Sequence, residues 1–269
     1  MKKLPSMAWS KAAVLPLLAL VIASGLVACQ PARGEDKTRP IVFVHGYNFS
    51  PASVDCGGTF DTMIAQLRSD GFTGPMIKVG YYAADTNCDV NLHSYGSFDD
   101  RDSWKSIAKA FSNYVQTTYT SKGTTIDAVG YSMGALVVRG AIYGSSIAES
   151  GFAAPLDIED YVSLGGPHAG AAWYSNGCLW GQCAAMKPGS TDLNWLNQNT
   201  NPKGKNGTDS TVIGSKADTT VPWESATYMS VYATNKEVFE LTPHSGSTNY
   251  THAHDVILRA DFALANPGQ

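Results

Sequence analysis

The chain alternates short apolar, β-branched runs with longer stretches whose apolar residues recur at helical spacing. The run at 41–44 (IVFV) is typical of a strand that is buried on both faces of a parallel sheet. Strands are predicted at 41–44, 75–82, 125–129, 161–164, 211–213 and 238–241, and helices at 59–69, 99–119, 132–143 and 256–265. This alternation predicts an α/β fold, with helices on both faces of a mostly parallel sheet, in a single domain over residues 40–269.

The first residues show a different pattern. Three lysines precede an uncharged apolar run at 12–28, which is the layout of a secretory signal peptide over residues 1–28. The run ends in Leu26-Val27-Ala28-Cys29, a sequence like the lipobox of bacterial lipoproteins. We expect lipid on Cys29, then a polar tether over residues 29–39. Ordinary cleavage nearby, giving a secreted or periplasmic protein, is the alternative.

Composition and charge narrow the possible partners. The chain is 43% hydrophobic and 16% charged, as in a globular enzyme, and its formal net charge is -4. Removing residues 1–28 takes away three lysines and no acid, so the charge becomes -7. A basic surface for nucleic acid is therefore not expected. Any attachment to a membrane would come from the lipid on Cys29.

The cysteines fit an exported protein. Five are present, and lipid on Cys29 would leave an even set of four. We favour the pairs Cys56–Cys88 and Cys178–Cys183, because the second pair is close in sequence and both lie in loop-like segments. The other two pairings stay open. A zinc site is disfavoured, since the cysteines lack paired short spacings and export favours oxidation.

The candidate nucleophile is Ser132, in the pentapeptide Gly130-Tyr131-Ser132-Met133-Gly134. Gly-x-Ser-x-Gly indicates a nucleophilic serine only when a strand precedes it and a helix follows, because the serine must sit on a tight turn between them. The segments 125–129 and 135–139 supply both. The alternative is a serine that merely caps the helix.

A serine nucleophile needs donors for the oxyanion. The backbone N–H of Met133, at the start of the helix, is one candidate. The second is expected in the loop after an early strand, where His45-Gly46-Tyr47 follows the strand at 41–44. Tyr47 would offer its N–H, Gly46 would allow close approach, and His45 is expected to be a positioning residue.

The acid and the base are expected downstream of the serine, in that order. Asp218 follows the strand at 211–213 and is the favoured acid, Glu224 is its nearest rival, and Asp209 lies before the strand. For the base we favour His254, which directly precedes the last predicted helix. His252 is the runner-up and His244 comes third.

The chain resembles the small bacterial triacylglycerol lipases of the α/β-hydrolase superfamily. The matching segments, in the family's order, are 42–47 (VFVHGY), 130–134 (GYSMG), 164–170 (LGGPHAG), 186–190 (MKPGS), 218–222 (DTTVP) and 254–258 (HDVIL). The resemblance implies an ester hydrolase with Ser132, Asp218 and His254 as its triad. It also implies the amides of Tyr47 and Met133 as oxyanion donors. Nothing in the residue pattern requires a metal or an organic cofactor.

The substrate is expected to be an acyl ester of a lipid. Aromatic residues at 171–174, 179–181 and 195–196 could line an acyl cleft, although packing is the simpler role for each. No long apolar helix stands out, which predicts a small lid or none.

Acids at positions 99, 100 and 102 are expected to favour a helix start rather than to hold calcium. The alternatives are a thioesterase, a polyester hydrolase, a phospholipase or a non-catalytic envelope lipoprotein.

Overall fold

The structure is a computed structural model, and it describes Met1 and residues 36–48, 53–172 and 181–266. Within these residues, seven strands form one sheet in the order β3-β2-β1-β4-β5-β6-β7, and every pair of neighbours is parallel. The strands are β1 (Ile41–Val44), β2 (Met76–Gly80), β3 (Val90–Asn91), β4 (Ile126–Tyr131), β5 (Ile158–Leu164), β6 (Asp209–Ser215) and β7 (Lys236–Phe239). The predicted parallel sheet is confirmed.

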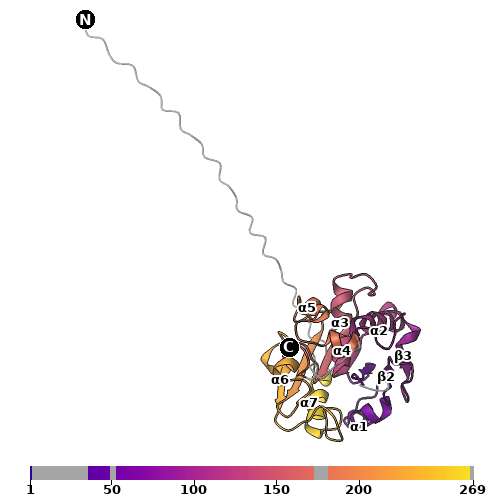
Figure 1. The fold of residues 1–269 in the computed structure, drawn as a ribbon. Coiled ribbons are helices and arrows are strands. Elements are labelled where there is room, and N and C mark those ends of the chain that lie inside the picture. Colours follow the sequence, from indigo (N-terminus) through magenta and orange to yellow (C-terminus); the bar gives the residue numbers. More distant parts are fainter. Residues whose placement is uncertain (2–35, 49–52, 173–180, 267–269) are drawn as a thin grey trace. The chain divides into compact units, whose positions relative to one another are not determined.

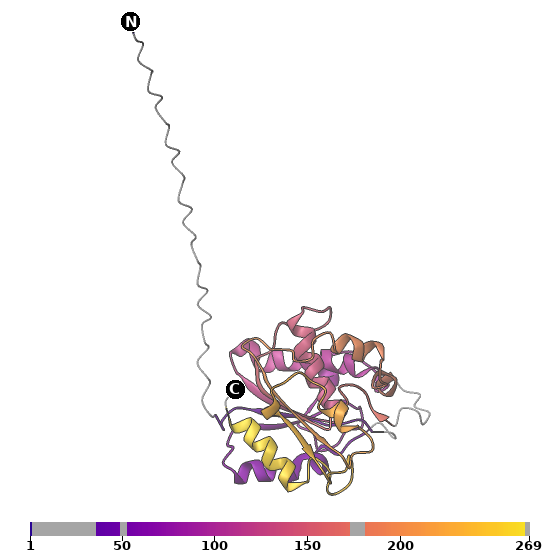
Figure 2. The same cartoon turned by 90° about the vertical axis from the view of Figure 1, so that its left-hand side faces the viewer.

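Helices cover both faces of this sheet, as predicted. The α-helices are α1 (Cys56–Ser69), α2 (Trp104–Thr118), α3 (Met133–Ser146), α4 (Gly181–Ala185), α5 (Thr191–Leu196), α6 (Trp223–Ala226) and α7 (His254–Ala265). Helices α1 and α7 pack on one face, and α2 and α3 on the other (Figures 1 and 2). Each side has its own apolar core, because the central strands β1, β4 and β5 are buried on both faces.

Several boundaries differ from the sequence-based ones for local reasons. Helix α2 begins at Trp104 rather than at 99, because the Ser103 side chain caps it by accepting from the Lys105 amide. The acids at 99, 100 and 102 therefore precede the helix instead of lying in its first turn. Strand β3, the short helices α4, α5 and α6, and the 3₁₀ helices at Leu92–Ser94, Thr120–Lys122 and Ala233–Asn235 were not predicted.

The segment after β2 is tied to helix α1 by the predicted disulfide Cys56–Cys88. The bond closes a ring across a sequence separation of 32 residues. Cys183 is also disulfide-bonded and fully buried. Its predicted partner, Cys178, lies outside the described residues.

The structure describes little of the predicted N-terminal segments. The predicted signal peptide beyond Met1 and the lipobox Cys29 lie outside the described residues. The end of the predicted tether is part of the fold, because the Lys37 carbonyl accepts from the amides of Thr73 and Gly74. Arg39 is buried there as well. No helix in the described part of the chain has both the length and the apolar character to cross a membrane.

Candidate active site

Ser132 lies on a sharp turn between β4 and α3, as the pentapeptide predicted. Its backbone has φ 54° and ψ -126°, a conformation that costs a residue with a side chain on the order of 1–3 kcal/mol. The flanking glycines make the turn possible. A Cβ on Gly130 would lie 2.5 Å from the Ala135 Cα, and one on Gly134 would lie 2.1 Å from the Val44 carbonyl oxygen.

A chain of hydrogen bonds runs from Ser132 through a histidine to a carboxylate. The Ser132 Oγ lies 2.9 Å from the Nε2 of His244, and the His244 Nδ1 lies 2.7 Å from the Oδ2 of Asp218. Because a carboxylate only accepts, the His244 Nδ1 carries the proton and Nε2 is left to accept from the serine hydroxyl. This tautomer is the one in which the imidazole can take the serine proton.

Asp218 lies in the loop after β6, and hydrogen bonds to both of its carboxylate oxygens hold it in place. Its Oδ1 accepts from the amides of Thr220 and Val221, each at 2.8 Å. Its Oδ2 accepts from His244 and, at 3.0 Å, from the Tyr250 hydroxyl. Burial and the nearby Asp218 charge raise the pKa of Tyr250, so that hydroxyl stays a donor. The carboxylate therefore has one orientation, aimed at the His244 ring.

His244 sits in the loop between β7 and α7, and Tyr131 holds this loop. The Tyr131 hydroxyl donates to the His244 carbonyl and receives a 3.4 Å hydrogen bond from the Asn249 side chain. The Tyr131 and His244 rings lie 5.6 Å apart at an interplanar angle of 31°. Tyr131, which directly precedes Ser132, thus positions the histidine that contacts Ser132.

The expectation that His254 is the base is corrected by this geometry. The hydrogen-bond partner of Ser132 is His244, which the sequence ranked third. His254 is the exposed first residue of α7. The runner-up, His252, is engaged in a local turn, where its Nδ1 lies 2.9 Å from the Asn249 Oδ1 and 3.0 Å from the Thr251 Oγ1.

The two expected oxyanion donors flank Ser132. Met133 is the buried first residue of α3 and follows the serine directly. On the other side, a Cβ on Gly46 would lie 2.7 Å from the Ser132 Cβ and 3.2 Å from its Oγ. The loop that carries the half-buried Tyr47 therefore touches the serine, and only glycine fits at position 46. Of the acid candidates that were set aside, Glu224 is exposed on α6, and Asp209 begins β6 and accepts from Asn235.

A second serine–histidine pair lies nearby, but its hydrogen bond runs in the opposite direction, from the histidine to the serine. The Ser163 Oγ lies 2.8 Å from the Nε2 of His168, and the His168 Nδ1 faces the Arg139 guanidinium at 3.4 Å. Because that guanidinium can only donate, the His168 Nδ1 accepts and Nε2 donates to Ser163. Burial and the Arg139 charge hold the pKa of His168 well below its usual range. His168 therefore cannot act as a base toward Ser163.

The aromatic segments proposed for the acyl cleft are only partly described. Residues 173–180 lie outside the described ranges. Trp195 is a packing residue, with its ring centroid 4.9 Å from that of Tyr143 and 5.7 Å from that of Phe152. Its indole nitrogen donates to Glu149, and the Lys105 ammonium lies 3.8 Å from its ring.

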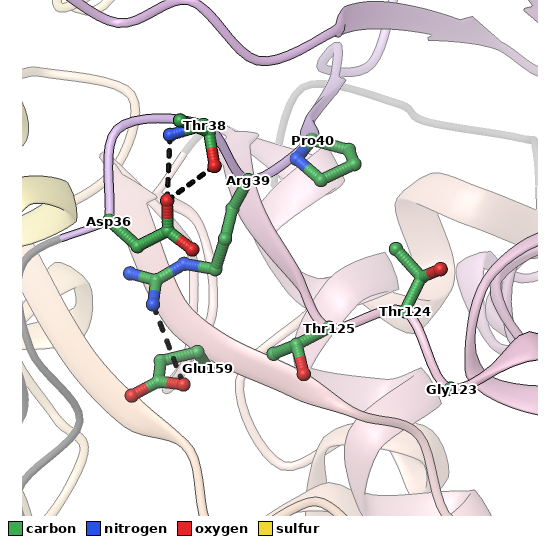
Figure 3. Close-up of a pocket in the computed structure, with 8 residues that line it drawn as sticks. All are labelled: Asp36, Thr38, Arg39, Pro40, Gly123, Thr124, Thr125 and Glu159. Carbon is green, nitrogen blue, oxygen red and sulfur yellow. Dashed lines mark hydrogen bonds and ion pairs between the residues drawn. The ribbon is translucent and has the colours of Figure 1, made fainter.

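A separate polar cavity of about 630 Å³ is lined by residues at the amino ends of β1, β4 and β5 (Figure 3). Ser132 follows the opposite end of β4. Arg39 lines it and pairs with Asp127 at 3.1 Å, Asp160 at 3.0 Å and Glu159 at 3.6 Å. Burial raises the pKa of Asp127 against the effect of Arg39. Burial and the Asp127 charge raise that of Asp160. This group of four residues, the Arg39 cluster, bears on stability rather than on the chemistry at Ser132.

Residues important to the site were missed in the sequence. Tyr131 and Tyr250 position the histidine and the acid, yet an isolated tyrosine carries no signal for either role. His244 had a usable signal, since it is the first histidine after the last strand. Asp85, discussed below, had none.

Three solved structures with a similar fold are named as lipolytic enzymes. Phospholipase PlaB from Legionella pneumophila superposes with a TM-score of 0.63 at 16% identity, over 86% of this chain and 59% of that one. Lipase BlEst2 from Bacillus licheniformis, in its propeptide form, gives 0.58 at 16% identity, over 88% and 53%. The monoacylglycerol lipase of Paleococcus ferrophilus gives 0.52 at 13% identity, over 86% and 96%. At such identities the likeness shows the fold alone, and this chain spans little more than half the length of the first two.

No curated protein sequence matches this chain closely enough to be counted. The model of the family described as lipase (class 2) matches residues 38–256, which include every residue of the hydrogen-bond chain from Ser132 to Asp218. Together with the solved structures, this match confirms the predicted α/β-hydrolase fold and the resemblance to lipases. The chain belongs to the class 2 lipase family.

Proposed function

We propose that the protein is a serine hydrolase that cleaves carboxylic esters of lipids through an acyl-enzyme on Ser132, with His244 as base and Asp218 as its orienting acid. The observation that carries this proposal is the continuous chain of hydrogen bonds, at 2.9 Å from Ser132 to His244 and 2.7 Å from His244 to Asp218. Membership of a lipase family supports the choice of an ester as substrate.

The mechanism follows from the protonation that this geometry imposes. As the Ser132 Oγ attacks the ester carbonyl carbon, the His244 Nε2 takes the hydroxyl proton, and the carboxylate of Asp218 stabilises the imidazolium. The amides of Tyr47 and Met133 are proposed to bind the oxyanion of the tetrahedral intermediate. The intermediate collapses when His244 returns the proton to the leaving alcohol oxygen. Water, activated by the same histidine, then releases the carboxylic acid and restores Ser132.

A fluorophosphonate probe tests the nucleophile directly. The wild-type protein should be labelled and Ser132→Ala should not. Ser163→Ala is the matched control, because Ser163 is also a serine bonded to a histidine, but one whose histidine cannot accept its proton. Labelling that persists in Ser132→Ala, or is lost in Ser163→Ala with the fold intact, would contradict the assignment.

A substrate panel tests the ester class. We expect hydrolysis of p-nitrophenyl esters and emulsified triglyceride. Acyl-thioesters, polyester film and phospholipid vesicles cover the alternatives on the same fold. A protein that labels with the probe but cleaves only one of these alternatives would change the substrate class and leave the mechanism in place. A protein that neither reacts with the probe nor hydrolyses any of these substrates would support the alternative of a non-catalytic envelope lipoprotein.

We also propose that the protein is exported and anchored by lipid on Cys29. The layout of residues 1–28 supports this, and so does the Cys56–Cys88 disulfide, since such bonds persist in oxidising compartments. Metabolic labelling with a palmitate analogue should mark the wild-type chain and not Cys29→Ser. Labelling of neither, with the chain exported, would leave a secreted or periplasmic enzyme as the answer. Labelling of both would place the lipid on a residue other than Cys29 and contradict the proposal.

A further inference from the structure

The loop that presents Tyr47 rests on a buried histidine, His45, whose two ring nitrogens both face acceptors. The Nδ1 lies 2.8 Å from the Gly46 carbonyl oxygen, and the Nε2 lies 2.7 Å from the Asp85 Oδ2. Neither a carbonyl nor a carboxylate oxygen can donate, so both nitrogens must carry protons. In this geometry His45 is an imidazolium ion with no exposure to solvent.

Backbone hydrogen bonds keep Asp85 a carboxylate opposite this cation. Its Oδ1 accepts from the Val54 amide at 2.6 Å, and its Oδ2 accepts from the amides of Tyr81 and Tyr82 at 2.7 and 2.9 Å. Burial acts to raise the pKa of Asp85, but the hydrogen bond and attraction of His45, together with hydrogen bonds from the Tyr82 and Val54 amides, hold the pKa below its usual range. The pair is thus a compensated buried ion pair, and each partner would be costly to bury alone.

The Gly46 carbonyl receives a second donor, the Tyr81 hydroxyl at 2.7 Å, which shares its proton with the His45 carbonyl at 2.9 Å. Burial raises the pKa of Tyr81 well above its usual range, so this hydroxyl stays protonated. The Tyr81 ring stacks on the His45 ring with centroids 4.0 Å apart. Two donors, one of them cationic, therefore fix a single carbonyl oxygen.

That oxygen belongs to the same peptide group as the Tyr47 N–H. In a planar trans peptide the C=O and the N–H point in opposite directions, so fixing one aims the other. Hydrogen bonds to the oxygen also polarise the group and strengthen the N–H as a donor, by about 10–30% for each bond. Since Gly46 packs against the Ser132 side chain, the amide that is aimed in this way lies beside the nucleophile.

We propose that Asp85 is a positioning residue which acts through His45, and that this buried ion pair orients and polarises the Gly46–Tyr47 peptide as an oxyanion donor. The inference rests on the proposed function, because an oxyanion forms only if Ser132 attacks a carbonyl. Asp85 itself contacts neither substrate nor Ser132. Its effect belongs to the transition state, so it should appear in kcat rather than in KM.

The first test compares Asp85→Asn with Asp100→Asn. The control removes a carboxylate that also accepts from a histidine, His93, and from a backbone amide, that of Ala83, but without contact to His45. We expect Asp85→Asn to lower kcat for a p-nitrophenyl ester about 10- to 100-fold, below or near the loss from removing an oxyanion donor outright, with KM within about threefold. Asp100→Asn should stay within about twofold of wild type.

Two further measurements keep the proposal testable if Asp85→Asn does not fold. Tyr81→Phe, which removes the other donor to the Gly46 oxygen, should also lower kcat and leave KM nearly unchanged. In wild-type protein labelled with ¹⁵N-histidine, the ring in contact with Tyr81 should show two protonated nitrogens at the pH of the kcat measurement. A neutral His45 at that pH, or folded Asp85→Asn and Tyr81→Phe proteins that both keep wild-type kcat, would overturn the proposal.

The outcomes separate the two claims. If the wild-type protein neither hydrolyses an ester nor labels with the fluorophosphonate, the proposed function fails, and the role of the ion pair in catalysis fails with it. If the wild-type protein is active but the variants and the NMR spectra give the overturning result, only the role of Asp85 is lost.

Discussion

Replacing His244 by Ala is the most direct test of the site, because the sequence pointed to a different histidine. The Nε2 of His244 lies 2.9 Å from the Ser132 Oγ and is the proposed acceptor of its proton, and the His244 Nδ1 lies 2.7 Å from the Asp218 carboxylate that is proposed to orient it. Without it the serine hydroxyl has no base. Loss of a triad histidine costs about 10⁴- to 10⁶-fold in kcat, which corresponds to about 5.5–8 kcal/mol of transition-state stabilisation.

The matched controls are His254→Ala and His252→Ala. His254 is exposed at the start of α7, so its replacement should change kcat less than about twofold. His252 holds a turn through Asn249, and losing that hydrogen bond should cost about 1 kcal/mol of stability with little change in kcat.

The assay is kcat on a p-nitrophenyl ester, with fluorophosphonate labelling as a second readout and thermal melting to confirm folding. If folded His254→Ala loses as much activity as His244→Ala, the assignment of the base is wrong.

Three further predictions concern stability. Ser132→Gly should be about 1–3 kcal/mol more stable to urea than Ser132→Ala, because glycine relieves the positive φ at the turn, and equal stabilities would show that the turn is unstrained. Replacing Cys56 and Cys88 together by Ala should lower the free energy of unfolding by about 4 kcal/mol, from the entropy of a ring of this size, and a loss under about 1 kcal/mol would contradict that estimate. The raised pKa values of Asp127 and Asp160 mean that the folded protein binds protons that the unfolded chain releases near pH 4. Their contribution to stability should therefore be complete below about pH 4 and decline as the pH rises toward the folded pKa values, by at most about 1.4 kcal/mol per pH unit for each proton. Asp160→Asn should flatten this dependence of the unfolding free energy on pH, as measured by urea titrations at several pH values. An unchanged slope would exclude the Arg39 cluster as its source.

The sequence predicted those parts of the fold whose signals are local. Buried strands such as β1 and β5 carry their own apolar runs, and Ser132 and Asp218 follow directly from the ends of β4 and β6. Strand β3 was missed because two half-buried residues form no pattern.

The proposed base was missed because its position depends on the path of a loop. Proximity to the last helix favoured His254, but the chain between β7 and α7 folds back so that Tyr131 can donate to the His244 carbonyl. That contact joins residues 113 positions apart, and no periodicity records it. The same holds for Asp85 and His45, which are 40 positions apart.

The Arg39 cluster and the proposed triad stand at opposite ends of the same strands. Five residues of strand, about 17 Å, separate Asp127 from Ser132. Two unit charges at that distance interact by about 1 kcal/mol at an effective dielectric constant near 20, which corresponds to less than one pH unit. The pH at which the protein is most stable and the pH at which it is most active are therefore set by different groups. Substitutions in the Arg39 cluster could therefore change the pH range in which the folded protein is stable, with little effect on the pH dependence of the reaction at Ser132.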